Sequence, residues 1–171
     1  LPAPLWTFDT TTFSSAQQHT LSLALARPSP VAAFGSLILT FSSSVSTVAD
    51  DAAIQFVATS KRIATFTVKA GDTAILLNGQ PNIVFSTGTT AGRITFTIDP
   101  GVFAIASDPT TVIHIGPAPI SVTASSATRI VNSLQMTVSG VDNTYTIGSM
   151  SFTCYYRAGV VIGSAIQCDF S

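Results

Sequence analysis

The residues that could do acid–base or metal chemistry are few in this chain and lie far apart in the sequence. There are two histidines, His19 and His114, and all eight acidic residues are aspartates. Metal sites need ligands at close spacing, and neither histidine has a cysteine or carboxylate at such a spacing. Asp50-Asp51 could begin a calcium loop, but the EF-hand spacing is absent and aspartates also form turns. We therefore expect no metal site and no cofactor.

Motifs for nucleophilic or phosphoryl chemistry are also absent from the sequence. Serine is abundant, but no Gly-x-Ser-x-Gly elbow occurs. The Gly- and Thr-rich stretch Ser86–Arg93 lacks the Gly-Lys-Ser/Thr of a phosphate loop. Paired glycosidase carboxylates need two acids in one cleft, and the aspartates here fall largely in turn sequences. We expect no catalytic residue, and the chain is not predicted to be an enzyme.

Cys154 and Cys168 are the only cysteines. A hairpin whose loop spans Arg157–Gly163 and which folds about position 161 would place them opposite each other, so a cross-strand disulfide is geometrically feasible. Such a bond would indicate an extracellular or periplasmic protein. The alternative is a pair of reduced, buried thiols.

Four aromatic residues could form a platform for sugar stacking: Trp6, Tyr145, Tyr155 and Tyr156. Aromatic side chains on a sheet face bind carbohydrate in some proteins and simply pack the strands in others. Both alternatives stay open, so glycans are one class of expected partner.

The overall composition describes a weakly charged chain with a polar, hydroxyl-rich surface. Of 171 residues, 46% are hydrophobic and only 9% are charged, and the net charge is −1. So small a charge gives no field to attract nucleic acid or an anionic membrane. No apolar run reaches the roughly 20 residues of a membrane span. Such a surface, and a chain that starts at Leu1, suit a processed, secreted protein at the cell surface; a shortened chain is the other explanation of this start.

Alternation of apolar and small polar residues predicts an all-β fold of antiparallel sandwich type. We expect an extended N-terminal arm over 1–15, where Pro2 and Pro4 exclude a helix. A β-sandwich lobe of about eight strands follows over 16–116. Its predicted strands are His19–Ala26, Ala33–Ser42, Ala53–Ala58, Ile63–Val68, Thr73–Leu77, Ile83–Ser86, Gly92–Ile98 and Thr111–Ile115.

The proline-rich stretch Gly116–Pro119 predicts a joint between two lobes. The second lobe, over 117–171, shows only four strands: Ile120–Ala124, Ile130–Ser139, Tyr145–Tyr156 and Val160–Phe170. Four strands are too few for an immunoglobulin-like (Ig-like) sandwich. Either this lobe joins the first one in a single sandwich, or another chain supplies a strand.

The N-terminal arm is a natural donor of such a strand, because it is extended, terminal and apolar on one face. Trp6, Phe8 and Phe13 would then form the subunit interface by filling pockets of a neighbouring copy. The alternative is that the arm is the first strand of its own domain.

Three stretches resemble Ig-like domains of bacterial secreted surface proteins: Ala26–Phe41 (ARPSPVAAFGSLILTF), Asp51–Phe56 (DAAIQF) and Thr87–Phe96 (TGTTAGRITF). In that family a second Ig-like domain follows a proline-containing joint, and Ile120–Ser171 resembles it, including Val138-Ser139-Gly140. The resemblance covers residues 18–171 and implies two Ig-like lobes. Such a second domain would continue with further strands where this chain stops, and incomplete sandwiches of this kind are similar to head-to-tail, pilus-like fibre subunits.

The expected function is therefore structural. We expect a subunit of an extracellular filament, assembled head to tail by β-strand addition, with copies of itself as partners. The alternative is an adhesin or carbohydrate-binding module from a larger secreted surface protein.

Overall fold

The computed structural model describes residues 1–101, 103–106 and 108–169, and within them the chain is all-β, with no helix. Its contacts divide the chain into a first unit, Leu1–Ala118, and a second unit, Pro119–Ser171. The division falls within the proline-rich stretch Gly116–Pro119. Each unit is described by itself below.

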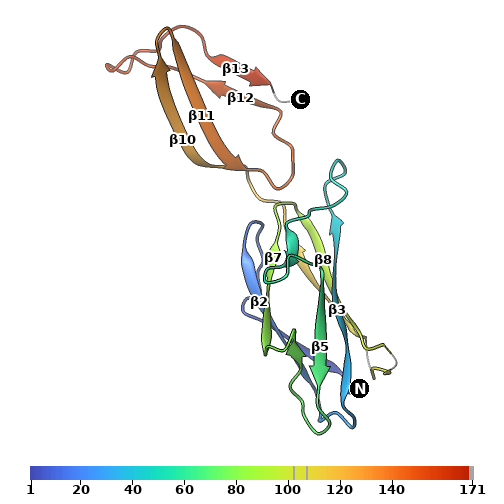
Figure 1. The fold of residues 1–171 in the computed structure, drawn as a ribbon. Helices are drawn as coiled ribbons and strands as arrows, with labels where there is room; N and C mark the ends of the chain where they lie inside the picture. The colour runs from blue at the N-terminus through green and yellow to red at the C-terminus, as the bar shows by residue number, and fades with distance from the viewer. Residues whose placement is uncertain (102, 107, 170–171) are drawn as a thin grey trace. The chain divides into compact units, whose positions relative to one another are not determined.

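The first unit consists of two antiparallel sheets (Figure 1). The four-stranded sheet has the order β1-β2-β7-β4 and the five-stranded sheet the order β6-β5-β3-β8-β9. In chain order the strands are β1 (Pro4–Phe8), β2 (Gln18–Leu25), β3 (Ala33–Ser43), β4 (Ile54–Phe56), β5 (Ile63–Val68), β6 (Leu76–Leu77), β7 (Asn82–Thr87), β8 (Gly92–Asp99) and β9 (Thr110–Ile115).

One hydrophobic core lies between these two sheets. In β8, Ile94, Phe96 and Ile98 are buried while the residues between them are more exposed, which is the period of two expected of a strand. Phe85 on β7 and Phe96 on β8 come from different sheets, and their ring centroids lie 4.9 Å apart in an edge-to-face arrangement. Full burial of one such side chain contributes about 1.5–3 kcal/mol. The unit therefore has the character of a β-sandwich with its own core.

The second unit has two separate two-stranded antiparallel sheets, β10-β11 and β12-β13. Its strands are β10 (Ser121–Ile130), β11 (Ser133–Val141), β12 (Ser149–Phe152) and β13 (Ile166–Asp169). Among residues 119–169 no hydrophobic side chain is buried, and the one buried residue is Asn143. An isolated two-stranded hairpin is marginally stable at best in water. Residues 119–169 of this unit therefore lack a core like the one that stabilises the first unit.

The predicted strand over residues 63–68 is confirmed to the residue, and the other strands of the first unit are confirmed with shifts at their ends. In the second unit the predicted boundary at Ile130 is wrong, because β10 continues to Ile130 and the chain then turns at 131–132. Val131 has a φ of 38°, which β-branched residues rarely adopt. The last predicted strand shortens to β13, and Phe170 lies outside the described residues.

The N-terminal segment is part of the first unit's own sheet. β1 pairs with β2 in antiparallel register from Pro4 opposite Leu25 to Phe8 opposite Leu21. Of the two alternatives for the arm, the structure shows the strand within its own domain. A role in a neighbouring copy would require this strand to leave β2.

Candidate functional site

The three aromatic residues predicted at a subunit interface pack inside the first unit. Trp6, Phe8 and Phe13 are partly buried against its core. The Phe8 ring lies 5.5 Å from Phe13, 5.7 Å from Phe96 and 6.0 Å from Phe85, measured between centroids. Aromatic contacts of this kind stabilise by about 0.5–1.5 kcal/mol beyond the area that they bury. In this structure the three residues therefore hold their own domain together.

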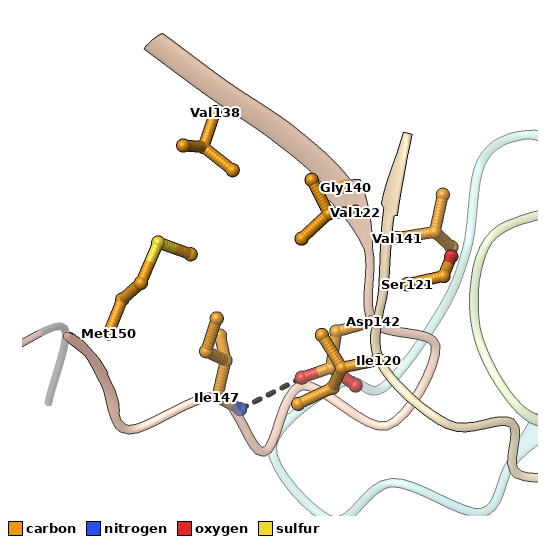
Figure 2. A pocket seen from close by; sticks show the side chains of 9 residues that line it. All are labelled: Ile120, Ser121, Val122, Val138, Gly140, Val141, Asp142, Ile147 and Met150. Carbon is orange, nitrogen blue, oxygen red and sulfur yellow. Dashed lines mark hydrogen bonds between the residues drawn. The ribbon is translucent and has the colours of Figure 1, made fainter. Parts of the chain in front are cut away.

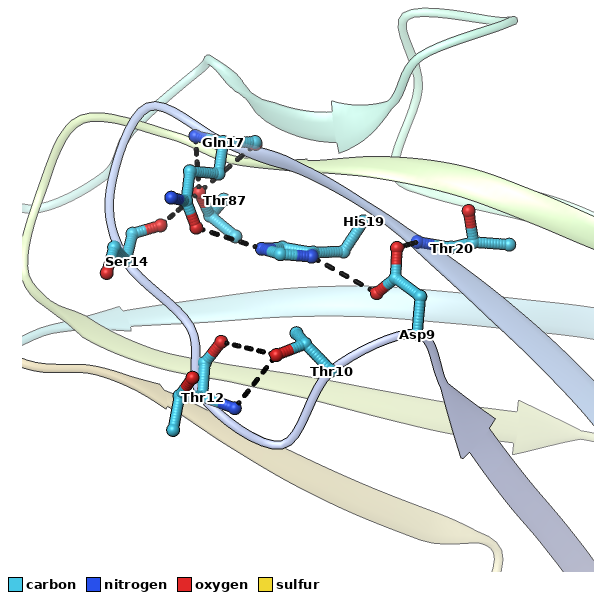
Figure 3. Close-up of polar contacts among 8 residues, drawn as sticks. All are labelled: Asp9, Thr10, Thr12, Ser14, Gln17, His19, Thr20 and Thr87. Carbon is cyan, nitrogen blue, oxygen red and sulfur yellow. Dashed lines mark hydrogen bonds and ion pairs between the residues drawn. The ribbon is translucent and has the colours of Figure 1, made fainter.

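Polar contacts fix the loop that follows β1 (Figure 3). His19 lies between two oxygen atoms: its Nδ1 is 3.1 Å from Asp9 Oδ1, and its Nε2 is 3.1 Å from Gln17 Oε1. The other Asp9 oxygen accepts a hydrogen bond from the Thr20 N–H at 3.0 Å. The imidazole ring also packs edge-to-face on Phe13, with 5.1 Å between centroids. His19 therefore ties the end of β1 to β2, and its ring nitrogens are both occupied.

Thr87 anchors the same loop from β7. Its hydroxyl is fully buried; it donates to the Ser14 carbonyl at 2.7 Å and accepts from the Gln17 N–H at 3.1 Å (Figure 3). Phe13 then forms a parallel bridge to Ile115 on β9. The N-terminal segment thus contacts both sheets of the first unit.

Asp51 is a buried carboxylate that holds a distant loop. Its Oδ2 accepts hydrogen bonds from the N–H groups of Thr89 at 2.6 Å and Thr90 at 2.9 Å, and Oδ1 accepts from Ala53 N–H at 3.0 Å. Burial raises the pKa of Asp51, but the hydrogen bonds from Thr89, Ala53 and Thr90 outweigh it, so the pKa lies below its ordinary value. The aspartate expected to form a turn therefore also fastens the connection between β7 and β8.

The neighbouring Asp50 differs from Asp51 in its surroundings. Its carboxylate forms an ion pair with Arg62 at 2.8 Å, and its side chain is 58% exposed. Arg62 also donates to the carbonyls of Ile54 and Asp51. Within the described residues no group of three His, Cys, Asp or Glu side chains could hold a metal ion.

The second unit contains an open apolar groove, drawn in Figure 2. It has a volume of about 250 Å³ and lies beside β10, β11 and the start of β12. We call this site the apolar groove; the apolar side chains that line it are those of Ile120, Val122, Val138, Val141, Ile147 and Met150. Val122 is 61% exposed. The groove is therefore a hydrophobic surface that the described residues leave uncovered.

Asp142 shapes one end of this groove (Figure 2). Its carboxylate accepts hydrogen bonds from the Thr144 hydroxyl at 2.7 Å and from the N–H groups of Thr144, Thr146 and Ile147. The bond from the Thr144 hydroxyl lowers the pKa of Asp142 most, slight desolvation raises it, and the N–H groups lower it further, to about 2. These bonds hold the loop 142–147 and position Ile147 in the groove wall.

The predicted disulfide is not formed in this structure, where Cys154 and Cys168 are both free and partly exposed. Cys168 lies opposite Met150, not opposite Cys154. The tip of the hairpin pairs Tyr155 with Val161, so the chain turns about three residues earlier than the predicted position 161.

The two histidines are not brought together, and the four aromatic residues of the possible sugar platform are divided between the two units. His114 is exposed on β9 opposite Arg93, in a different sheet from His19. Trp6 belongs to the first unit, whereas Tyr145, Tyr155 and Tyr156 belong to the second and are 52–60% exposed. Sequence reasoning missed the anchoring roles of Thr87 and Asp142. The spacing Asp-x-Thr could have indicated the role of Asp142. In both Asp108–Thr110 and Asp142–Thr144 the aspartate accepts hydrogen bonds from the N–H and the hydroxyl of the threonine.

Comparison with protein-family models, with curated proteins and with solved structures finds no match to this chain. None of the described residues belongs to a helix that is long and apolar enough to cross a membrane.

Proposed function

We propose that this chain is a structural subunit of an extracellular filament, in which a β-strand of one copy adds to the second unit of the next. This proposal depends on one observation: no hydrophobic side chain of residues 119–169, in the second unit, is buried. Such a unit exposes the surface that a folded domain normally covers. A strand from a neighbour would supply that cover.

The apolar groove suits an extended segment as its occupant. It is lined mainly by aliphatic side chains, and each strand of the second unit has a single partner among the described residues, which leaves open edges beside the groove. In strand addition the main-chain hydrogen bonds supply affinity, and pockets for alternate side chains supply specificity. A contact between different surfaces of two copies repeats without closing and yields fibres.

The proposal also includes an Ig-like fold for both units. The first unit, whose described residues form nine strands in two antiparallel sheets that share one core, supports this assignment. The second unit has four strands over its described residues 119–169, fewer than the seven of the smallest Ig sandwich. Its deficit is what the neighbour's strand would complete.

The N-terminal segment is the proposed donor. β1 is an edge strand with β2 as its one sheet partner, so it can leave without opening the interior of the sheet. Release would separate Phe8 from its aromatic contacts and Asp9 from His19. Donation therefore requires the groove to bind these side chains better than their own domain does.

The first experiment changes the groove and leaves the first unit intact. Val122→Lys places a charge in the groove, and Val160→Lys makes the same change at an equally exposed valine, 61% in both cases, that does not line the groove. We expect filaments of the wild-type chain and of Val160→Lys by electron microscopy and light scattering, and short or no filaments of Val122→Lys. A wild-type chain that stays monomeric, or equal filaments in both variants, would overturn the proposal.

A second experiment identifies the donor. Thr7 and Ser22 lie opposite each other in the β1–β2 pair, at a separation that a disulfide can span. Thr7→Cys with Ser22→Cys, in a chain whose native cysteines are serine, would lock β1 to its own sheet. We expect filaments only after reduction. Filaments of the locked chain would show that β1 is not the donor.

The alternative function is that of an adhesin or carbohydrate-binding module. The exposed tyrosines of the second unit favour it, because Tyr145, Tyr155 and Tyr156 present apolar ring surface to solvent. A glycan array tests this function. Binding by a monomeric chain that is lost in Tyr155→Ala would support it, and an array without signal would exclude the glycans tested.

A further inference from the structure

We propose that the β12–β13 hairpin has a second register, shifted by four residues, in which Cys154 and Cys168 lie opposite each other and form a disulfide under oxidising conditions. The proposal concerns a modification site within one chain. It does not depend on filament formation.

The observed register keeps the two thiols apart. Met150 lies opposite Cys168, and Phe152 lies opposite Ile166. Cys154 is four residues beyond Met150, which at about 3.3 Å per residue places it about 13 Å along the hairpin from the position opposite Cys168. A disulfide needs Cα atoms within about 7 Å of each other. The bond therefore requires a change of register and cannot form by side-chain rotation alone.

The observed register is weakly fixed. Register is strongly specified where one face of a sheet is buried, and no residue of β12 or β13 is buried. The hairpin also changes register along its own length: between the pairs Phe152–Ile166 and Tyr155–Val161, two residues of one strand face four of the other. Gly163, with a φ of 67°, is one of the four residues on the longer side. The hairpin thus already contains an irregularity next to Cys154.

A shift of four residues preserves the chemistry of both faces. Because the number is even, each side chain stays on the face where it lies now. Cys154 replaces Met150 opposite Cys168, and Tyr156 replaces Phe152 opposite Ile166, so an aromatic residue again faces the isoleucine. The shift gives up the short pairing at the tip, which includes the hydrogen bond from Tyr156 N–H to the Val160 carbonyl at 2.8 Å.

The shifted register has the geometry for the bond. Residues directly opposite each other in an antiparallel pair have Cα atoms about 4.5–5.5 Å apart, within the range of disulfides. With oxidised glutathione, one cysteine thiolate attacks the reagent and forms a mixed disulfide, releasing one glutathione thiol. The second cysteine thiolate displaces the other glutathione. The two cysteines lose two electrons and two protons in all, and the reagent becomes two thiols.

The experiment treats the dilute, purified full chain with oxidised glutathione and analyses the intact mass and the non-reduced peptides. Since the chain has only two cysteines, one intramolecular bond is feasible. We expect a monomer lighter by two hydrogens and a peptide that links Cys154 to Cys168.

A matched variant samples the register seen in the structure. Met150→Cys with Cys154→Ser places the new thiol opposite Cys168. We expect this variant to close quickly and the wild-type chain to close more slowly, through the second register. Closure of the wild-type chain alone would make the second register dominant and would also support the proposal. A wild-type chain that gives only glutathione adducts or linked dimers would overturn it.

Discussion

The two adjacent aspartates Asp50 and Asp51 allow one chemical change to be made in two opposite environments. We expect Asp51→Ala to destabilise the first unit strongly and Asp50→Ala to leave it almost unchanged. The Asp51 side chain is buried and accepts hydrogen bonds from three main-chain N–H groups, of Ala53, Thr89 and Thr90. The Asp50 side chain is 58% exposed and has one ion pair.

The loss of stability in Asp51→Ala can be estimated from the N–H groups that lose their hydrogen-bond acceptor. Water can replace the acceptor for the exposed residues Ala53 and Thr89, so each loss costs about 1 kcal/mol. Thr90 is fully buried, and its N–H would be left without an acceptor, at about 2 kcal/mol. The sum for Asp51→Ala is about 4 kcal/mol, whereas an exposed ion pair such as that of Asp50 contributes less than about 1 kcal/mol.

The assay uses the single tryptophan, which lies on β1 and therefore reports on the first unit alone. We expect the melting temperature from its fluorescence to fall by about 15 °C in Asp51→Ala and by less than about 4 °C in Asp50→Ala. The lowered pKa of Asp51 adds a pH signature. The stability that the Asp51 carboxylate contributes is complete above its pKa in the unfolded chain, about 3.9, and is lost as the pH falls through its lower pKa in the folded protein. Equal melting temperatures of the two variants at pH 7 would refute the reasoning.

Three further perturbations test other parts of the structure. Gly88→Ala should destabilise the first unit, because φ at this position is 68° and a Cβ there would also overlap the Ile54 side chain. Gly71→Ala has open space around it and should cost only the backbone strain. Urea unfolding compares the two variants, and equal midpoints would contradict the steric argument. The Asp142 carboxyl carbon should titrate with a midpoint near 2 by NMR, and a midpoint near 4 would contradict the hydrogen bonds assigned to it. Phe8→Ala should lower the stability of the first unit by about 2–3 kcal/mol, somewhat below the value for a fully buried phenylalanine, and an unchanged urea midpoint would show that β1 is not packed on the core.

Sequence patterns predict the first unit well because burial there follows the period of the strands. The segment 63–68 alternates in sequence, and in β5 it alternates in burial as well. The joint at Gly116–Pro119 is visible because proline stops sheet pairing. The pattern does not fix the boundaries of a strand. The strand predicted over 73–77 is in the structure only the two-residue strand Leu76–Leu77.

The second unit was harder to predict because little is buried in it. Without a buried face, alternation does not fix the register, and the predicted hairpin centre near 161 missed the observed pairing of Met150 with Cys168. Side-chain bonds to the backbone decide the rest. The carboxylate of Asp142 binds the N–H groups of Thr146 and Ile147, which removes both from the strand predicted over 145–156.

The parallel bridge between Phe13 and Ile115 has a mechanical consequence. Tension between the two ends of the first unit would pull these neighbouring segments in opposite directions along their common axis, so the contacts between the two segments would be loaded together in shear. In the second unit Ser121 and Val141 are opposite partners at the open end of the β10–β11 hairpin, so pulling on them would load the pairs one at a time, as in a zipper. In single-molecule stretching we expect the second unit to extend at a low force and the first unit to give way at a distinctly higher one. In the single chain the second unit would then be the extensible element and the first unit the stiff one.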